Sequence, residues 1–434
     1  MTHLVMRGAA AGSLLSLLFA AVPAAAQSSI ADDDPPLRDA GFIGVPQPEG
    51  RNFLLAGSLR TRYDTNFRRQ TVARGASRIT PFVEAGIGLP VGQQQLFVGG
   101  TLGRDVFPGN SRFNRNRYSI GAGGNLRAGS RCTANVGGQY SSQQLLQTDV
   151  ADLEDNVQKR STLGASFNCQ APVGIGFGAS VIRRDARNER AQRSLFDFDT
   201  LSIAPQISYA SPVLGTFTLS GSRQQVRYPN RLVISPDGPE QDGVDIDTAR
   251  FGFSRALGTR LNLSLGASYN DVKPQPDGQL LLTAVPGQVV LVPRPGFKGA
   301  GFDAGLTLRV GARMSLAASG DRSVSGGGNV GSLFQVRNSF GIDADYRLSR
   351  ALTAGVGGRM INNDYRGGFA SVDEPIRRIS DTTKRVYAQL AFSPTPRYSI
   401  STEIGHQTRD SNPELFSFSN TFGMLRMRVQ LGRG

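Results

Sequence analysis

The chain has 434 residues, which is enough for two or three soluble domains or for one large β-barrel. Hydrophobic residues make up 39% and charged residues 19%, both low for a soluble enzyme, and so few apolar residues exclude a helical membrane transporter. The formal net charge is +14, and two histidines are too few for most histidine-based metal and acid–base sites.

Residues 1–26 have the features of a secretory signal peptide. Arg7 gives a charged start, a short apolar run follows, and Ala24 to Ala26 supply the small residues that precede a cleavage site. The run is shorter than a membrane-spanning helix, so we expect cleavage rather than an anchor. Residues 27–50 include an acidic run and are expected to form a disordered periplasmic tail. Residues 51–434 are then expected to form a single barrel domain.

From Phe53 onward the chain repeats one pattern, in which apolar and polar residues alternate over about ten positions. Leu261 to Asn270 and Phe302 to Val310 show it clearly. A period of two residues indicates a strand with one apolar and one polar face. Strands of soluble sandwiches usually have five or six residues, whereas about ten residues are needed to cross a membrane at a tilt.

The connections between these strands alternate between short and long. Gln170–Val173 and Gly311–Arg313 are short, whereas Asp64–Ser77, Pro229–Asp247 and Asp271–Gly299 are long. Short turns on one side and long loops on the other are typical of outer-membrane barrels. The sequence therefore predicts an all-β fold, a transmembrane antiparallel up-and-down β-barrel of about 18 strands, with 16 as the next choice. Short turns and both termini would lie in the periplasm, and the alternative is a soluble all-β protein.

The two cysteines occupy matching places in one predicted hairpin. Cys132 opens a strand just after a short turn, and Cys169 closes the next strand just before another short turn. Both fall in the outward phase, and antiparallel pairing brings the start of one strand opposite the end of the other. In an exported protein this arrangement predicts a Cys132–Cys169 disulfide at the periplasmic rim, the alternative being two free thiols facing lipid.

If the apolar face meets lipid, the polar face lines the inside of the barrel. The predicted pore-lining residues are charged and lie in this inward phase: Arg60, Arg62, Arg250, Arg309, Arg347, Arg359, Arg385, Arg426, Arg428, Asp303, Asp343, Asp345 and Glu403. Charged rings in a channel select its solutes, so an arginine-rich bore favours anions. Alternatively, these charges pair across strands and stiffen the wall. Inward glycines such as Gly176 and Gly178 are expected to widen the bore.

The longest predicted loop, Asp271–Gly299, has an apolar middle. Two β-prone runs flank Pro286 and Gly287, which predicts a hairpin. We expect this hairpin to extend the two neighbouring strands beyond the membrane. The alternative is that the apolar segment folds into the bore and constricts it.

Taken together, the signal peptide, the acidic tail, the strand pattern, the two cysteines and the arginine-rich inner face resemble the β-barrel porin 2 family. The resemblance covers about Phe53 to Leu431 and implies a proteobacterial, Gram-negative outer-membrane barrel of a kind often linked to exopolysaccharide export. We expect a porin-like conduit for hydrophilic solutes, including anions, or for an exported polysaccharide. The alternative is a structural, adhesive or export-scaffold barrel with a blocked lumen.

An outer-membrane barrel also has expected partners, and the sequence predicts no catalytic or metal site. Partners would be outer-membrane lipid and lipopolysaccharide, the insertion machinery and, in the export case, periplasmic export components; nucleic acid is not expected. No catalytic residue, cofactor or metal site is predicted, because the mature chain keeps one histidine, His406, in the outward phase. Five acids between Asp237 and Asp247 lack the spacing of an EF-hand and are expected to lie in a solvated loop.

Overall fold

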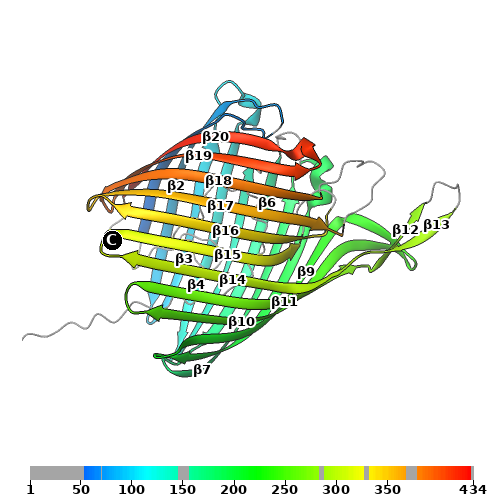
Figure 1. Ribbon diagram of the computed structural model, residues 1–434, viewed down its shortest axis with the longest axis horizontal. Coiled ribbons are helices and arrows are strands. Elements are labelled where there is room, and N and C mark those ends of the chain that lie inside the picture. The colour runs from blue at the N-terminus through cyan, green and yellow to red at the C-terminus, as the bar shows by residue number, and fades with distance from the viewer. Residues whose placement is uncertain are drawn as a thin grey trace, which may run out of the picture.

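The structure is a computed structural model that describes residues 53–69, 71–144, 156–282, 288–326, 332–367 and 379–431. Within these ranges, eighteen antiparallel strands form one closed sheet, because β1 (Phe53–Asp64) pairs with both β2 (Ala76–Val91) and β20 (Phe418–Gln430) (Figure 1). The predicted fold and strand number are confirmed. No helix in the described part of the chain is long and apolar enough to span a membrane. The predicted signal peptide and acidic tail lie outside the described residues.

Consecutive strands pair around the barrel, with β14 following β11. The described barrel strands have 12 to 21 residues, so the prediction of about ten was too short. The other strands of the barrel are β3 (Gln94–Asp105), β4 (Arg115–Ala128), β5 (Cys132–Gln144), β6 (Val157–Cys169), β7 (Gly174–Asn188), β8 (Phe198–Ser211), β9 (Gly215–Ser235), β10 (Gly238–Leu257), β11 (Leu261–Gln275), β14 (Phe297–Val310), β15 (Met314–Gly326), β16 (Phe334–Arg347), β17 (Leu352–Arg366), β18 (Ser380–Thr395) and β19 (Tyr398–Asn412). A separate hairpin contains β12 (Gly278–Leu282) and β13 (Val289–Pro293).

Short turns gather at one end of the barrel, where β1 begins and β20 ends. Glycines at positive φ, such as Gly92 (φ +62°) and Gly311 (φ +65°), allow these tight reversals. The predicted long loop at 229–247 is wrong, because β9 and β10 continue through most of it to a tight turn. Its acids Asp242 and Asp245 pair with arginines instead of lying in a solvated loop.

The two faces of the sheet differ as the alternation predicts. On β11, Leu265 and Tyr269 are 45% and 54% exposed, whereas Asn270, which points to the opposite face of the sheet, is 4% exposed. Large apolar side chains are exposed in the same phase on many strands, for example Phe251, Ile342 and Ile404. Side chains crowd on the concave face of a closed sheet, so the exposed apolar series is the outer face.

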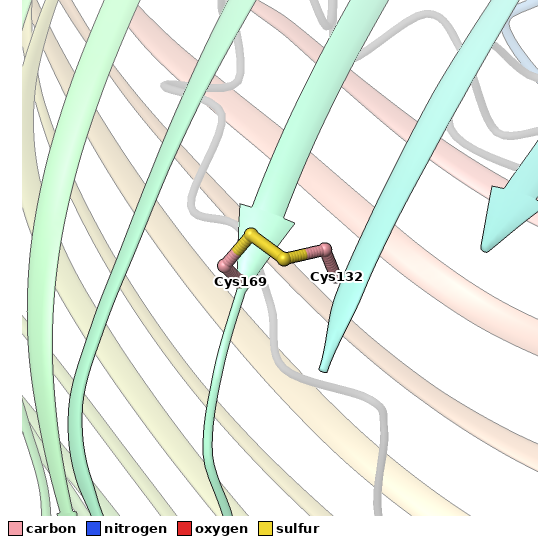
Figure 2. The surroundings of a disulfide bond; sticks show 2 residues. All are labelled: Cys132 and Cys169. Atoms are coloured by element: carbon pink, nitrogen blue, oxygen red, sulfur yellow. A yellow bond between two sulfur atoms is a disulfide. The ribbon is translucent and has the colours of Figure 1, made fainter. Parts of the chain in front are cut away.

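The disulfide prediction is confirmed. Cys132 and Cys169 lie directly opposite each other on β5 and β6, with their Cα atoms 4.0 Å apart and their sulfurs bonded (Figure 2). The bond lies at the short-turn end of the hairpin, because β5 begins and β6 ends there.

The region predicted as the longest loop extends the wall of the barrel. β11 continues to Gln275, β14 begins at Phe297, and the hairpin of β12 and β13 projects away from the barrel (Figure 1). The described part of this hairpin does not enter the bore, so the extension is confirmed and the alternative of a constriction is wrong. A buried ion pair holds its base. Arg294 donates to Asp242 Oδ1 at 2.5 Å, and the two side chains are 3% and 0% exposed.

Near the long-loop end the wall overlaps itself. The ladder between β14 and β15 ends at Phe302–Arg322, although both strands continue beyond it. Beyond that point the Phe297 and Phe334 rings lie 6.4 Å apart, and the buried members of one apolar cluster fill the seam: Ala186, Phe198, Val226, Tyr228, Val244, Ile246, Val272, Leu333, Phe334 and Val336. Apolar packing therefore closes the rim where backbone pairing stops.

Candidate functional site: the inner face of the barrel

Strand register places all thirteen predicted pore-lining residues in the phase opposite to the exposed apolar side chains, on the inner face. Arg60 and Arg62 on β1 are 6% and 2% exposed and alternate with outward Leu59 and Tyr63 at 40% and 52%. Arg309 and Arg347 lie beside the short turns, at the end of β14 and of β16.

Arginines gather on the inner face of β17 to β20, β1 and β2. In the described strands, three arginine pairs lie directly opposite each other, namely Arg60–Arg426, Arg62–Arg78 and Arg359–Arg385. Like charges in directly opposite positions destabilise a sheet. These pairs concentrate arginine side chains on this part of the wall.

Acidic side chains bind part of this charge. Arg428 lies 2.8 Å from Glu84, which is 2% exposed. Arg385 donates to Glu403 at 2.6 Å. Arg62 makes two hydrogen bonds of 2.8 Å to Asp64 on its own strand. The prediction that inward charges pair across strands therefore holds for some of them, while the arginine pairs described above remain next to one another.

Phe422 on β20 lies between two of these arginines. Its ring centroid is 4.3 Å from the Arg62 guanidinium carbon and 4.8 Å from that of Arg385, so both make cation–π contacts. Gly405 makes room for the ring, since a Cβ there would lie 2.5 Å from Phe422 Cζ. The ring holds the guanidinium groups at fixed places on the wall.

Beside this aromatic ring lies a buried amide. Gln407 has no exposed surface, and neither of its side-chain polar atoms has a hydrogen-bond partner among the described residues. A buried amide without partners costs about 1–3 kcal/mol. Water or a polar solute at this point of the wall would remove that cost.

The inner face of β14 to β16 carries aspartates instead. Arg250 makes two hydrogen bonds of 2.7 Å to Asp303. Asp343 accepts a hydrogen bond from the Tyr387 hydroxyl, and Asp345 accepts one of 3.1 Å from Gln389. These strands also carry Arg309, Arg337 and Arg347 on the inner face, so this part of the wall has charges of both signs, whereas the directly opposed arginine pairs lie on β17, β18, β20, β1 and β2.

The inward glycines do not widen the bore in the predicted way. At Gly178, a Cβ would lie 2.9 Å from Asn168 Oδ1 and 3.1 Å from Gln206 Nε2. At Gly176, the side chains of Gln170 and Ser208 occupy the corresponding space. These glycines instead allow long polar side chains from neighbouring strands to lie across them.

Several inner residues were not predicted from the sequence. Arg78 lay in an expected strand but was not assigned to the inner face; Arg117 lies at the end of a long connection that the sequence predicts at 106–117, and Arg409 lies beyond the strand length that was expected. A longer run of alternation past the apolar band would have identified them. Tyr387 and Phe422 could have been found from the sequence, because each is an aromatic residue at a position where the alternation places the polar face.

His406 lies on the outer face, where its Nδ1 is 2.8 Å from Thr421 Oγ1, as its phase predicts. Within the ranges that the structure describes, no group of three or more histidine, cysteine or acidic side chains is arranged to hold a metal ion.

No family model matches the chain, and no curated protein matches it either. Among solved structures, it is similar to OccK2 (OpdF) of Pseudomonas aeruginosa in complex with glucuronate, at 10% identity and a TM-score of 0.47, over 88% of this chain and 98% of that one. The outer membrane protein OpdK of the same organism matches at 10% identity and a TM-score of 0.46, over 87% and 99%. The siderophore receptor PirA, also from that organism, matches at 9% identity and 0.44, over 87% and 80%. Likenesses this weak carry no argument about function, and membership of the β-barrel porin 2 family stays a prediction.

Proposed function

We propose that the chain is a porin-like conduit of a Gram-negative outer membrane that passes small hydrophilic solutes and favours anions. The observation that carries this proposal is the set of opposed arginine pairs on the inner face, Arg60–Arg426, Arg62–Arg78 and Arg359–Arg385. These arginines would attract anions passing along the wall, although Arg62 and Arg385 also bind Asp64 and Glu403. The exposed apolar side chains on the outer face and the closed sheet support insertion into a membrane, since only helices and closed barrels leave no backbone group unpaired in lipid.

Barrels with this many strands enclose an aqueous channel unless a segment plugs it. The described part of the β12–β13 hairpin projects away from the opening, which supports an unplugged mouth. Polysaccharide export was implied only by the family resemblance, so the proposal names small solutes and leaves export aside.

A non-transporting barrel with a blocked lumen is the second candidate, and one observation favours it. Thr80, Gln407 and Asn420 on the inner face have no exposed surface. This stretch of the wall is therefore out of contact with solvent, as it would be in a filled lumen.

Single-channel recording of the refolded mature protein in a planar bilayer with a salt gradient tests both candidates. We expect steady openings and a reversal potential that indicates anion preference. Arg359→Gln should weaken that preference about twofold or more, because it removes one inner charge. Lys384→Gln is the matched control, since this exposed residue precedes Arg385 on β18 and lies on the outer face opposite Met360.

Correct folding is checked by heat-modifiable migration on gels. Folded protein that never opens would overturn the conduit and support the blocked barrel. Openings with cation preference would contradict the role given to the arginine pairs, as would an equal effect of both substitutions.

A further inference from the structure

The outer face carries a second set of charges, which the conduit does not use. Six cations stand outward on β7, β9, β11 and β14 near the long-loop end: Arg183, Arg187, Arg223, Arg227, Lys273 and Lys298. We call this set, with the aspartates that pair with it, the charged flank. It covers β7 to β11 and β14, which are adjacent in the sheet.

The charged flank begins where the apolar band ends. Tyr269 is 54% exposed, and the next outward positions on its strand are Asp271 and Lys273. On β14, Phe302 is 39% exposed, and the flank residue Lys298 lies two outward positions away. The flank therefore lies at the level where a membrane's hydrocarbon gives way to its headgroups.

Ion pairs within the flank leave the cations on the outside. Arg223 lies 3.2 Å from Asp245, and the two side chains are 58% and 7% exposed. Lys273 lies 3.1 Å from Asp271, with exposures of 54% and 23%. Lys298 is 69% exposed and 4.0 Å from the same Asp271.

Arg183, Arg187 and Arg227 repeat this order, since each is more exposed than the aspartate that it meets. The aspartates are less exposed than the cations, so the cations form the outermost layer of the flank. The surface that a neighbour touches is therefore positive, even though acids almost balance the total charge.

The other side of the barrel differs. Near the same end, the outward positions on β18, β19, β20 and β1 include Thr382, Thr408, Thr421 and Thr61. Exposed outward cations elsewhere, such as Arg104, Arg366 and Lys384, lie singly on their strands and stand apart from the flank. The concentration of cations is therefore a property of one side.

We propose that the charged flank binds the phosphate groups of lipopolysaccharide in the outer leaflet, on one side of the barrel. This inference rests on the outer-membrane placement in the proposed function. Guanidinium and ammonium groups are the usual phosphate donors, arginine through two parallel hydrogen bonds and lysine as a point charge. The apolar side chains below the flank would contact the acyl chains of the same molecule, so one lipid would meet both parts of the surface.

Native mass spectrometry tests the proposal. The refolded full chain is mixed with diphosphoryl lipid A in neutral detergent, and the spectrum shows how much lipid stays bound when the detergent is removed. The variant R223Q/K298Q removes two flank cations, and R104Q/K384Q is the matched control with one arginine and one lysine on other strands. We expect the flank variant to bind lipid A about 30-fold more weakly, since each cation near a membrane surface contributes about fivefold. The control should bind like the unaltered protein, and lipid A without phosphates should bind weakly to all three.

Equal binding by the flank variant and the unaltered protein would overturn the proposal, as would equal retention of dephosphorylated lipid. Loss of dimers from the flank variant, with unchanged lipid binding, would show a contact between copies of this chain instead. Conductance of the flank variant separates this inference from the proposed function. Normal channels without phosphate-dependent lipid binding would refute the flank alone, whereas phosphate-dependent binding to a folded but silent barrel would refute the conduit alone.

Discussion

Removing the disulfide should destabilise the barrel by a calculable amount. The bond joins Cys132 to Cys169, which are 37 residues apart in the chain. Closing a loop of that length lowers the entropy of the unfolded chain by an amount worth about 4 kcal/mol at 25 °C. The variant C132A/C169A should therefore lose about 4 kcal/mol of unfolding free energy, with its native fold retained because the two strands pair over their whole length.

Guanidinium unfolding of the refolded protein in phospholipid vesicles measures this loss. The unaltered protein with and without reductant is the control, since reduction should reproduce the effect of the double substitution. A loss below about 1 kcal/mol would refute the loop-entropy argument and indicate that the unfolded hairpin is already constrained. Two alkylatable thiols in the unreduced protein would refute the bond itself.

Three further predictions concern the rim and the inner face. Asp242→Asn should leave the buried Arg294 without its counter-charge and cost about 3–5 kcal/mol locally, seen as faster proteolysis of the β12–β13 hairpin with unchanged conductance. Phe334→Ala should cost about 3–5 kcal/mol in the apolar seam, seen as faster amide hydrogen exchange at the long-loop ends of β15 and β16; unchanged exchange there would contradict a sealing role. Anion preference should fall as salt rises from 0.1 to 1 M, because the screening length shortens from about 10 to about 3 Å; a constant preference would mean that pore size selects the solute.

The general architecture followed from the period of the sequence. Alternation of apolar and polar residues fixes which face meets lipid, since a shift of one residue would turn every side chain to the other side. The same parity placed Cys132 and Cys169 on one face at one end of a hairpin, which the structure confirms. Parity needs no knowledge of distant contacts, so it can be read from local sequence.

Strand length and rim structure were harder to predict for a physical reason. Apolar alternation ends where the membrane ends, but backbone pairing continues through β9 and β10 for several residues of polar sequence. Those residues are held by contacts between segments far apart in the chain, such as Arg294 with Asp242 and Tyr228 with Leu333. Local composition resembles that of a loop, and only the fold shows that it is strand. The same error hid Arg117 and Arg409 from the predicted inner set.

Like charges lie directly opposite each other on both faces of the barrel: Lys159 meets Arg187 and Asp247 meets Asp271 on the outer face, whereas three arginine pairs lie on the inner face. On the outer face, flank cations alternate with aspartates, so Arg223 and Lys273 each have an acid within 3.2 Å. On the inner face, arginines of adjacent strands lie directly opposite each other, as Arg60 and Arg426 do. The inner face differs in having three opposed pairs that are all arginines, and under the proposed function this excess of arginine would attract a passing anion.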